Sequence, residues 1–114
     1  MSFSDLRTFL DSVDDRGALK KINGAHWDLE IGTLSELIIE RPDHPALVFD
    51  NIPGYPKGFR VLSNSLSTIS RTAIALGLPA ETQGLEVLDY WRKKMRTFEP
   101  VTPKTVHEGP ILEN

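Results

Sequence analysis

The feature that most restricts the fold is the apolar run Ala46-Leu47-Val48-Phe49, which lies between Pro45 and Asp50. A strand with one face in water alternates apolar and polar residues, and this run has no such alternation. A short uninterrupted apolar run is typical of a strand that is covered on both faces. We therefore predict a strand over residues 46–49, with other parts of the structure packed on both of its sides.

Two further strands are predicted on either side of this one. Residues 51–58 hold two prolines and two glycines, which predicts a loop. The apolar residues of 59–62 then predict a strand that pairs with the run before the loop. Residues 18–22 predict another short strand, although its alternation is imperfect, and Asn23-Gly24 marks the turn that follows it.

The first half of the chain also predicts two helices from apolar residues spaced three and four apart. The first has Ser4 as its N-cap and ends at Gly17, which can take the left-handed conformation. The second has Asp28 as its N-cap and ends at Arg41-Pro42, because a residue before proline avoids the helical region. The residues expected to face inward are Leu6, Phe9, Leu10 and Val13 in the first helix, and Ile31, Leu34, Leu37 and Ile38 in the second.

Two more helices and an extended arm are predicted in the second half. A third helix begins near Ser67 and ends at Gly77, and a fourth opens near Thr82. The helical spacing stops after Phe98, and residues 99–114 hold three prolines without a regular pattern, as in an extended connector. The residues expected to face inward are Ile69, Ala73 and Leu76, then Leu85, Leu88, Trp91 and Met95.

The predicted element order indicates an α/β fold. We expect a small single domain over residues 1–98, in which a short mixed sheet is flanked by about four helices. Residues 99–114 are expected to form an extended C-terminal arm, a connector that leads out of this domain.

Composition and charge narrow the class of protein. The 114 residues suffice for one domain, and the absence of cysteine excludes disulfides, thiolate metal sites and cysteine nucleophiles. A net charge of −3 gives no general attraction to nucleic acid, and no apolar run approaches the roughly 18 residues that span a membrane. The N-terminal residues lack the cationic start of a secretory signal, so a cytoplasmic protein is expected.

Histidines and acidic pairs are the first candidates for chemistry. His26, His44 and His107 lie far apart in the sequence, and none has a second ligand at metal-binding spacing. His26 and Asp28 could act as a base and its orienting carboxylate, but a histidine in a turn beside a helix cap is the favoured interpretation. The pairs Asp14-Asp15 and Glu36/Glu40 invite an acid–base hypothesis, yet the polar sides of amphipathic helices explain them better.

A loop and a basic cluster are the remaining candidates. The loop 51–58 has glycines and a lysine, but it lacks the spacing of a phosphate-binding loop, and its prolines remove amide donors. A structural hairpin is the favoured interpretation. The cluster Trp91-Arg92-Lys93-Lys94-Met95-Arg96 could contact nucleic acid or an anionic ligand. We favour a helix whose basic residues lie on the wet face while Trp91 and Met95 turn inward.

Beyond periodicity, the middle of the chain resembles the amino-terminal region of the UbiD family. The resemblance lies in HPALVFDNIPGYPKGFRVLSN at 44–64 and RTAIALGL at 71–78. The flanking segments SDLRTFLDSVDDRGALKKI, DLEIGTLSEL and VHEGPILEN are also similar, in the same order. The family consists of reversible decarboxylases that act with prenylated flavin mononucleotide, so the resemblance implies an N-terminal domain of such an enzyme. The resemblance also implies that Tyr55 and the rigid Pro-Gly turn of the loop shape a surface between domains.

The resemblance implies more than this chain contains. In the family the prenylated FMN, a divalent metal, a monovalent cation and the catalytic arginine and glutamates all belong to a central domain beyond these residues. We therefore assign no catalytic, cofactor-binding or metal-binding residue here, and expect a chain that is inactive alone and packs on the cofactor domain of an oligomeric enzyme. Aromatic or α,β-unsaturated acids are the implied substrates. The alternative is a free-standing, non-catalytic subunit whose arm, Glu99 to Asn114, docks on a separately encoded catalytic subunit.

Overall fold

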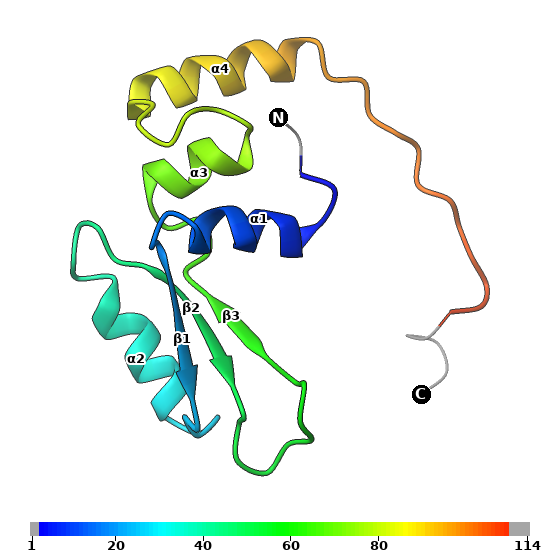
Figure 1. Cartoon of the computed structure of the whole chain (residues 1–114). Coiled ribbons are helices and arrows are strands. Elements are labelled where there is room, and N and C mark those ends of the chain that lie inside the picture. The colour runs from blue at the N-terminus through cyan, green and yellow to red at the C-terminus, as the bar shows by residue number, and fades with distance from the viewer. Residues whose placement is uncertain (1–2, 110–114) are drawn as a thin grey trace.

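The computed structural model describes residues 3–109 as an α/β fold with a three-stranded mixed sheet and four helices (Figure 1). This confirms the predicted fold class and the predicted order of elements. The elements are α1 (Leu6–Asp14), β1 (Leu19–Asn23), α2 (Glu30–Ile38), β2 (Ala46–Asp50), β3 (Val61–Ser63), α3 (Ile69–Ala75) and α4 (Gly84–Arg96).

The sheet has the strand order β1-β2-β3. β1 runs parallel to β2, with Leu19 opposite Ala46, and α2 provides the crossover that a parallel pair requires. β3 runs antiparallel to β2, with Leu62 opposite Val48, which confirms the pairing predicted across the loop 51–58. Because β2 lies between two neighbours, its backbone is the best-paired part of the sheet.

Two apolar clusters form the core. α2 covers one face of the sheet, where Leu47 and Phe49 are buried together with Ala25. α1 and α3 meet at the other cluster, which contains Phe9, Val13 and Ile74 and has Leu19 of β1 packed against it. Figure 1 shows α1, α3 and α4 stacked in that order, with α4 farthest from the sheet.

β2 is less enclosed than its sequence predicts. Ala46, Leu47 and Phe49 are buried, but Val48 is only partly buried. Val48 lies on the face opposite to α2, which α1 covers only at one end, beside Leu19. We predicted a strand covered on both faces, and this is wrong for the face opposite to α2, which is only partly covered.

α1 begins one residue later than expected, because Asp5 and not Ser4 is its N-cap. The Asp5 carboxylate accepts a hydrogen bond from the backbone N–H of Thr8 at 2.8 Å, and the Thr8 hydroxyl lies 3.4 Å from the backbone N–H of Asp5. The backbone bond from Thr8 to the carboxylate, and then the bond that the Thr8 hydroxyl donates to it at 3.1 Å, lower the pKa of Asp5. Gly17 has a φ of 69° just beyond the helix, as predicted.

The start of α2 differs from the prediction in how the helix is capped. Asp28 does not cap the helix through its side chain; its carbonyl accepts a hydrogen bond from Glu30 N–H at 2.8 Å. This bond spans two residues and places Leu29 at the centre of a γ-turn, with a φ of 67°. On the helix itself, Leu34 and Leu37 are exposed, contrary to expectation, whereas Ile31 and Ile38 pack on the core.

The apolar faces of α3 and α4 are also more exposed than predicted. α3 ends at Gly77, as expected, with a hydrogen bond from Leu78 N–H to the carbonyl of Ala73. The residues of α3 that are buried are Arg71, Ala73 and Ile74, while Ile69 is exposed. In α4 only Val87 is buried, because the main packing partner of this helix is the short helix α3. The α4 residues predicted to face inward but found exposed are Leu85, Leu88, Trp91 and Met95.

The chain beyond α4 leaves the body of the molecule. From Phe98 to Gly109 it has no helix or strand, and Figure 1 shows it running away from the other elements. The last five residues of the predicted arm, 110–114, lie outside the described part. The radius of gyration is 17.2 Å, against about 13 Å for a compact domain of this length. None of the helices within residues 3–109 is both long and apolar enough to cross a membrane.

Candidate functional site

The three histidines do not converge. His26 is exposed, stacks on Trp27, and its Nδ1 accepts a hydrogen bond from the backbone N–H of Asp28 at 3.1 Å. Within residues 3–109 no hydrogen bond joins the Asp28 carboxylate to this ring, so the hypothesis of a base with its orienting carboxylate has no geometry to support it. His107 is exposed on the arm, and His44 is buried far from both.

The acidic pairs lie on the surface. Asp14 forms a salt bridge with Lys21 at 2.6 Å, and Asp15 lies at the C-terminal end of α1. Glu36 and Glu40 are exposed, as the solvated-face interpretation expects. Within residues 3–109, no group of three or more histidine, aspartate or glutamate side chains could hold a metal ion.

The loop 51–58 is a structural turn with an apolar anchor. Ile52 is buried, whereas Tyr55 is exposed, and Gly54 and Gly58 have φ values of 86° and 102°. Asp50 holds the base of the loop: it accepts hydrogen bonds from Asn51 N–H at 2.8 Å and from Arg60 at 2.9 Å. These bonds, first the one from Asn51, lower the pKa of Asp50. Such a loop offers a shaped surface and no phosphate cradle.

A buried polar cluster, which the sequence did not reveal, connects the loops around β2 and α3. Arg71 and His44 are only 3% and 5% exposed. The Arg71 guanidinium donates to the carbonyls of His44, Asn64 and Ser65 at 2.6, 3.0 and 3.1 Å, and to the Ser67 hydroxyl at 3.1 Å. Burial lowers the pKa of Arg71. No carboxylate in the described part of the chain pairs with it, so backbone dipoles stabilise its charge.

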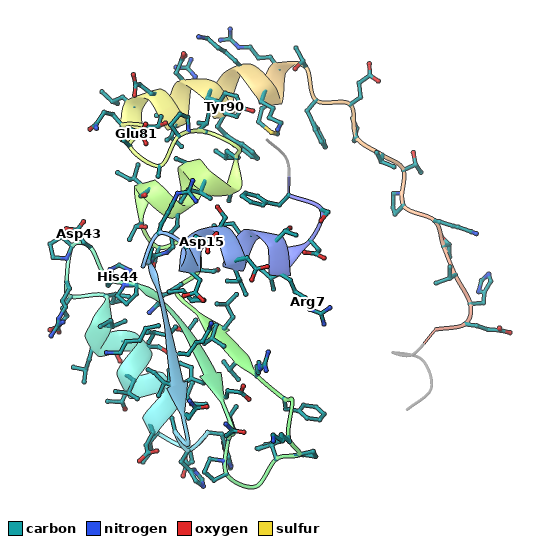
Figure 2. All side chains as sticks on the ribbon, in the orientation of Figure 1. Arg7, Asp15, Asp43, His44, Glu81 and Tyr90 are labelled. Carbon is teal, nitrogen blue, oxygen red and sulfur yellow. The ribbon has the colours of Figure 1, made fainter. Side chains whose placement is uncertain are left out.

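His44 completes this cluster. Its Nδ1 lies 2.7 Å from the carbonyl of Arg41, and because a carbonyl only accepts, Nδ1 carries a proton. Its Nε2 lies 2.6 Å from the Ser67 hydroxyl. Figure 2 shows His44 between α2 and α3, where the chain enters β2. A serine beside a histidine resembles a nucleophile and its base, but here both side chains are held by Arg71 and by loop carbonyls, so the cluster is structural.

These residues do not fit a flavin or a metal ion. A flavin phosphate needs free N–H donors or unpaired cations, and four of the five Arg71 N–H donors are already bound to protein oxygens in a buried position. A divalent metal needs clustered carboxylates or histidines, which residues 3–109 do not provide. The described part of the chain therefore gives no step of cofactor chemistry.

Exposed apolar surfaces are the most prominent features that remain. The first is a groove of about 480 Å³ along the seam of α3 and α4, which we call the α3/α4 groove. The second is a hollow of about 500 Å³ over the open sheet face, beneath α1. The third is the outer side of α2. The groove is lined by Leu66, Thr72, Ala75, Leu76, Gly84, Val87, Leu88 and Trp91, and the hollow includes Leu10, Leu19, Val48 and Leu62.

The basic cluster of the sequence lies at one end of the α3/α4 groove. Arg92, Lys93, Lys94 and Arg96 are exposed, as predicted, but Trp91 and Met95 are 45% and 48% exposed and do not turn inward. Lys93 pairs with Asp89 at 2.6 Å and Lys94 lies 5.7 Å from the centre of the Tyr90 ring. α4 is therefore an amphipathic basic helix whose apolar side is largely open.

The total exposed surface indicates that these openings are substantial. The chain exposes 9090 Å², whereas a compact monomer of this length exposes about 6,300 Å². The excess of about 2,800 Å² combines the surface of the extended arm with that of the open faces, and it exceeds the roughly 800 Å² that one partner contributes to an ordinary protein interface. The site that the structure presents is thus a set of contact surfaces.

Comparison with known proteins gives these surfaces a context. Residues 10–91 match the family model described as the 3-octaprenyl-4-hydroxybenzoate carboxy-lyase N-terminal domain, UbiD_N. A phenolic acid decarboxylase of Escherichia coli O157:H7 is 36% identical in an alignment of 107 positions that covers 91% of this chain and 22% of that protein. A phenolic acid decarboxylase of Streptomyces sp. (strain D7) is 32% identical in an alignment of 117 positions that covers 100% of this chain and 24% of that protein.

Solved structures show the same fold. Vanillic acid decarboxylase of Sedimentibacter hydroxybenzoicus matches in an open form with a TM-score of 0.79 at 24% identity, over 93% of this chain and 22% of that chain. Its closed form matches with a TM-score of 0.73 at 25% identity, over the same shares of the two chains. The chain thus spans less than a quarter of the length of the relatives it matches.

Proposed function

Because the chain belongs to the UbiD N-terminal domain family, we propose that it is a structural part of a UbiD-like decarboxylase. It packs on the part that binds the cofactor and helps to wall the active site. The observation that carries this proposal is the exposed apolar surface of a chain whose relatives are more than four times longer. Surface that a compact monomer would bury is here available to the rest of such an enzyme.

The chemistry of the complete enzyme is part of this proposal. By family membership it would use prenylated FMN, with a divalent metal and a monovalent cation, on aromatic or α,β-unsaturated acids. The names of the two relatives, both phenolic acid decarboxylases, support an aromatic acid. We assign none of the cofactor contacts or catalytic groups to this chain, and we retain the cytoplasmic location and the oligomeric enzyme as expectations.

The arrangement of the chain is also proposed. Residues 1–98 act as one domain and residues 99–114 as the connector to the cofactor-binding part. The collinear match within longer relatives favours this arrangement over a free-standing subunit that docks through its arm. The extended course of Phe98–Gly109 is compatible with both arrangements.

Reconstitution tests the proposal. The purified chain is mixed with a second polypeptide that carries the rest of the enzyme, and light scattering coupled to size-exclusion chromatography measures the complex. Turnover of phenolic and α,β-unsaturated acids is then followed with prenylated FMN present. We expect no turnover by the chain alone, a stable complex, and decarboxylation that depends on the complex.

Two results would contradict this function. Turnover by the pure chain supplied with cofactor would make it an enzyme in its own right. A folded monomer that does not bind the second polypeptide, with that polypeptide fully active without it, would remove the structural role.

A further inference from the structure

We propose that the α3/α4 groove is the docking site for an amphipathic helix of the cofactor-binding part, one with an apolar ridge and carboxylates along its flank. This inference rests on the proposed function and assigns it to one surface of the chain. It follows from three features of α4: an open apolar floor, a row of unpaired cations, and its position at the outside of the molecule.

The floor of the groove is apolar and offers no polar anchor for a small ligand. The lining has the Trp91 indole N–H as a donor and one hydroxyl, that of Thr72, which already donates to the carbonyl of Leu66 at 3.1 Å. The other lining side chains are apolar. A small-molecule site needs a few convergent polar groups to fix orientation, and these two groups, one of them already bonded, do not make such a set. A long, open, apolar seam between two helices instead fits the side-chain ridge of a third helix.

The spacing along α4 sets the charge at the rim. Val87, Trp91 and Met95 follow one another at intervals of four, so they form one row along the helix. Leu88, Arg92 and Arg96 form the adjacent row on the same basis. The groove therefore has an apolar wall that continues into cations towards the C-terminal end of α4.

These cations have no strong partner of their own. Within residues 3–109, the guanidinium groups of Arg92 and Arg96 make no hydrogen bond or salt bridge. They act on the Asp89 carboxylate only through longer-range attraction. The Asp89 carboxylate is already bound to Lys93 at 2.6 Å. Free guanidinium groups beside an apolar groove favour carboxylates on the occupant, because Arg pairs with carboxylate in a bidentate geometry.

The charge also decides between possible occupants. A second copy related by a twofold axis would bring two basic α4 helices together, and like charges at an interface oppose binding. Nucleic acid would use the cations but would leave the apolar floor exposed, and the chain as a whole carries a charge of −3. An acidic amphipathic helix uses both the floor and the rim.

A binding experiment with matched variants tests this docking site. The chain carries Trp27→Phe, so that Trp91 is its one tryptophan, and the probe is the polypeptide that carries the rest of the enzyme, whose own emission is subtracted. We expect the Trp91 emission to shift to shorter wavelength on binding. Leu88→Asp should raise the dissociation constant at least about thirtyfold, since it places a charge in an apolar contact. The double variant Arg92→Glu/Arg96→Glu should raise the dissociation constant about tenfold and make it less dependent on salt concentration.

The controls separate this inference from the function on which it rests. Leu85→Asp makes the same change on α4 outside the lining of the groove, and Arg41→Glu reverses an exposed charge after α2; both should leave the dissociation constant within about twofold. Circular dichroism confirms that each variant is folded, which the exposure of all these side chains favours.

Each remaining outcome decides the question. If the unmodified chain binds and Leu88→Asp binds equally well, the docking site is wrong and the proposed function stands. If the chain alone dimerises and Leu88→Asp abolishes the dimer, a second copy occupies the groove and this inference is overturned. If the unmodified chain does not bind the rest of the enzyme at all, the proposed function fails and this inference fails with it.

Discussion

Arg71 holds together segments that are far apart in the sequence. One guanidinium binds oxygens that precede β2 and oxygens of the connection between β3 and α3. Arginine suits this position because its planar fork presents several donors at once, which a lysine cannot do. Since the charge is buried without a carboxylate, its hydrogen bonds to carbonyls are what make the burial tolerable.

We expect Arg71→Met to destabilise the fold by about 3 kcal/mol, because buried carbonyls lose a charged donor and gain no substitute. Arg71→Lys should recover only part of this loss. Urea unfolding followed by circular dichroism measures the free energy of unfolding. The matched control is Arg7→Met, since Arg7 projects from the exposed side of α1 (Figure 2) and its loss should cost less than about 0.5 kcal/mol. Equal losses of unfolding free energy in the two variants would show that Arg71 stabilises the fold no more than an exposed arginine does.

Asp5 links stability to acid pH. Its pKa in the folded chain lies below the ordinary value of 3.8, chiefly because its carboxylate accepts the Thr8 N–H. The resulting stabilisation is fully present above 3.8 and is lost as pH falls through the lower folded value. Asp5→Asn can still cap the helix but does not titrate in this range. We therefore expect the free energy of unfolding of the wild type, relative to Asp5→Asn, to fall between pH 7 and pH 2, as measured in urea.

A constant difference between these two proteins across that range would contradict the link. Asp50 and Asp89 also have lowered pKa values, so both proteins lose stability in acid. Their contribution is common to the two proteins and cancels in the difference, as long as the sites do not interact.

At the scale of elements, the γ-turn before α2 is a strained connection. Leu29 has a φ of 67° and a ψ of −45°, a conformation that side chains with a Cβ rarely adopt, and it is 77% exposed. Leu29→Gly removes this strain without losing buried surface, although glycine gains entropy in the unfolded chain. We expect a net increase of about 1 kcal/mol in the free energy of unfolding.

The control for this prediction is Leu37→Gly. Leu37 is also exposed but lies within α2, where glycine costs about 1 kcal/mol. The two substitutions should thus change stability in opposite directions in the same urea experiment. A loss of stability in both would mean that Leu29 is not strained.

The elements themselves could be predicted, because their signals are local. Apolar spacing, Gly17 and Gly77 located the helices, and the run at 46–49 located the strand in the middle of the sheet. Helix starts were less predictable: Asp5 and Ser4 are both good caps, and only the three-dimensional contact with Thr8 distinguishes them.

The direction in which a helix faces could not be predicted in the same way. Periodicity shows which residues share a face, but it does not show whether the partner of that face lies in the same chain. Leu88 and Trp91 share an apolar face as expected, and that face is open. The Arg71 cluster was missed because a buried polar residue breaks no periodic rule; the one available signal was an arginine three residues before buried Ile74, on the inward side of α3.

At the scale of the whole molecule, the open faces lie on different elements. α2 leaves Leu34 and Leu37 exposed, the sheet leaves Val48 partly covered, and α4 leaves Leu88 and Trp91 exposed. A domain that is stable without a partner would bury at least some of this apolar surface, since apolar burial is its main source of stability. Their combination with a detached arm is consistent with a domain that is completed by a larger partner.

The arm provides the last prediction. Lys104 is the one lysine or arginine between Phe98 and Gly109, where the described chain makes no helix or strand. Proteases cut segments that need no unfolding, whereas the bonds after Arg92 and Arg96 require α4 to open first. Trypsin should therefore produce a fragment of residues 1–104 before any other product, as mass spectrometry can show, and Lys104→Gln should abolish it.

The same cleavage distinguishes the two arrangements of the arm. If residues 99–114 are a connector, Lys104 stays accessible when the rest of the enzyme binds, and the rate of cleavage changes by less than about twofold. If the arm is itself a docking strand, its backbone becomes hydrogen-bonded to the partner and cleavage slows at least about tenfold. Earlier cleavage within α4 than at Lys104 in the free chain would contradict both arrangements, because it would mean that the arm is held against the body of the molecule.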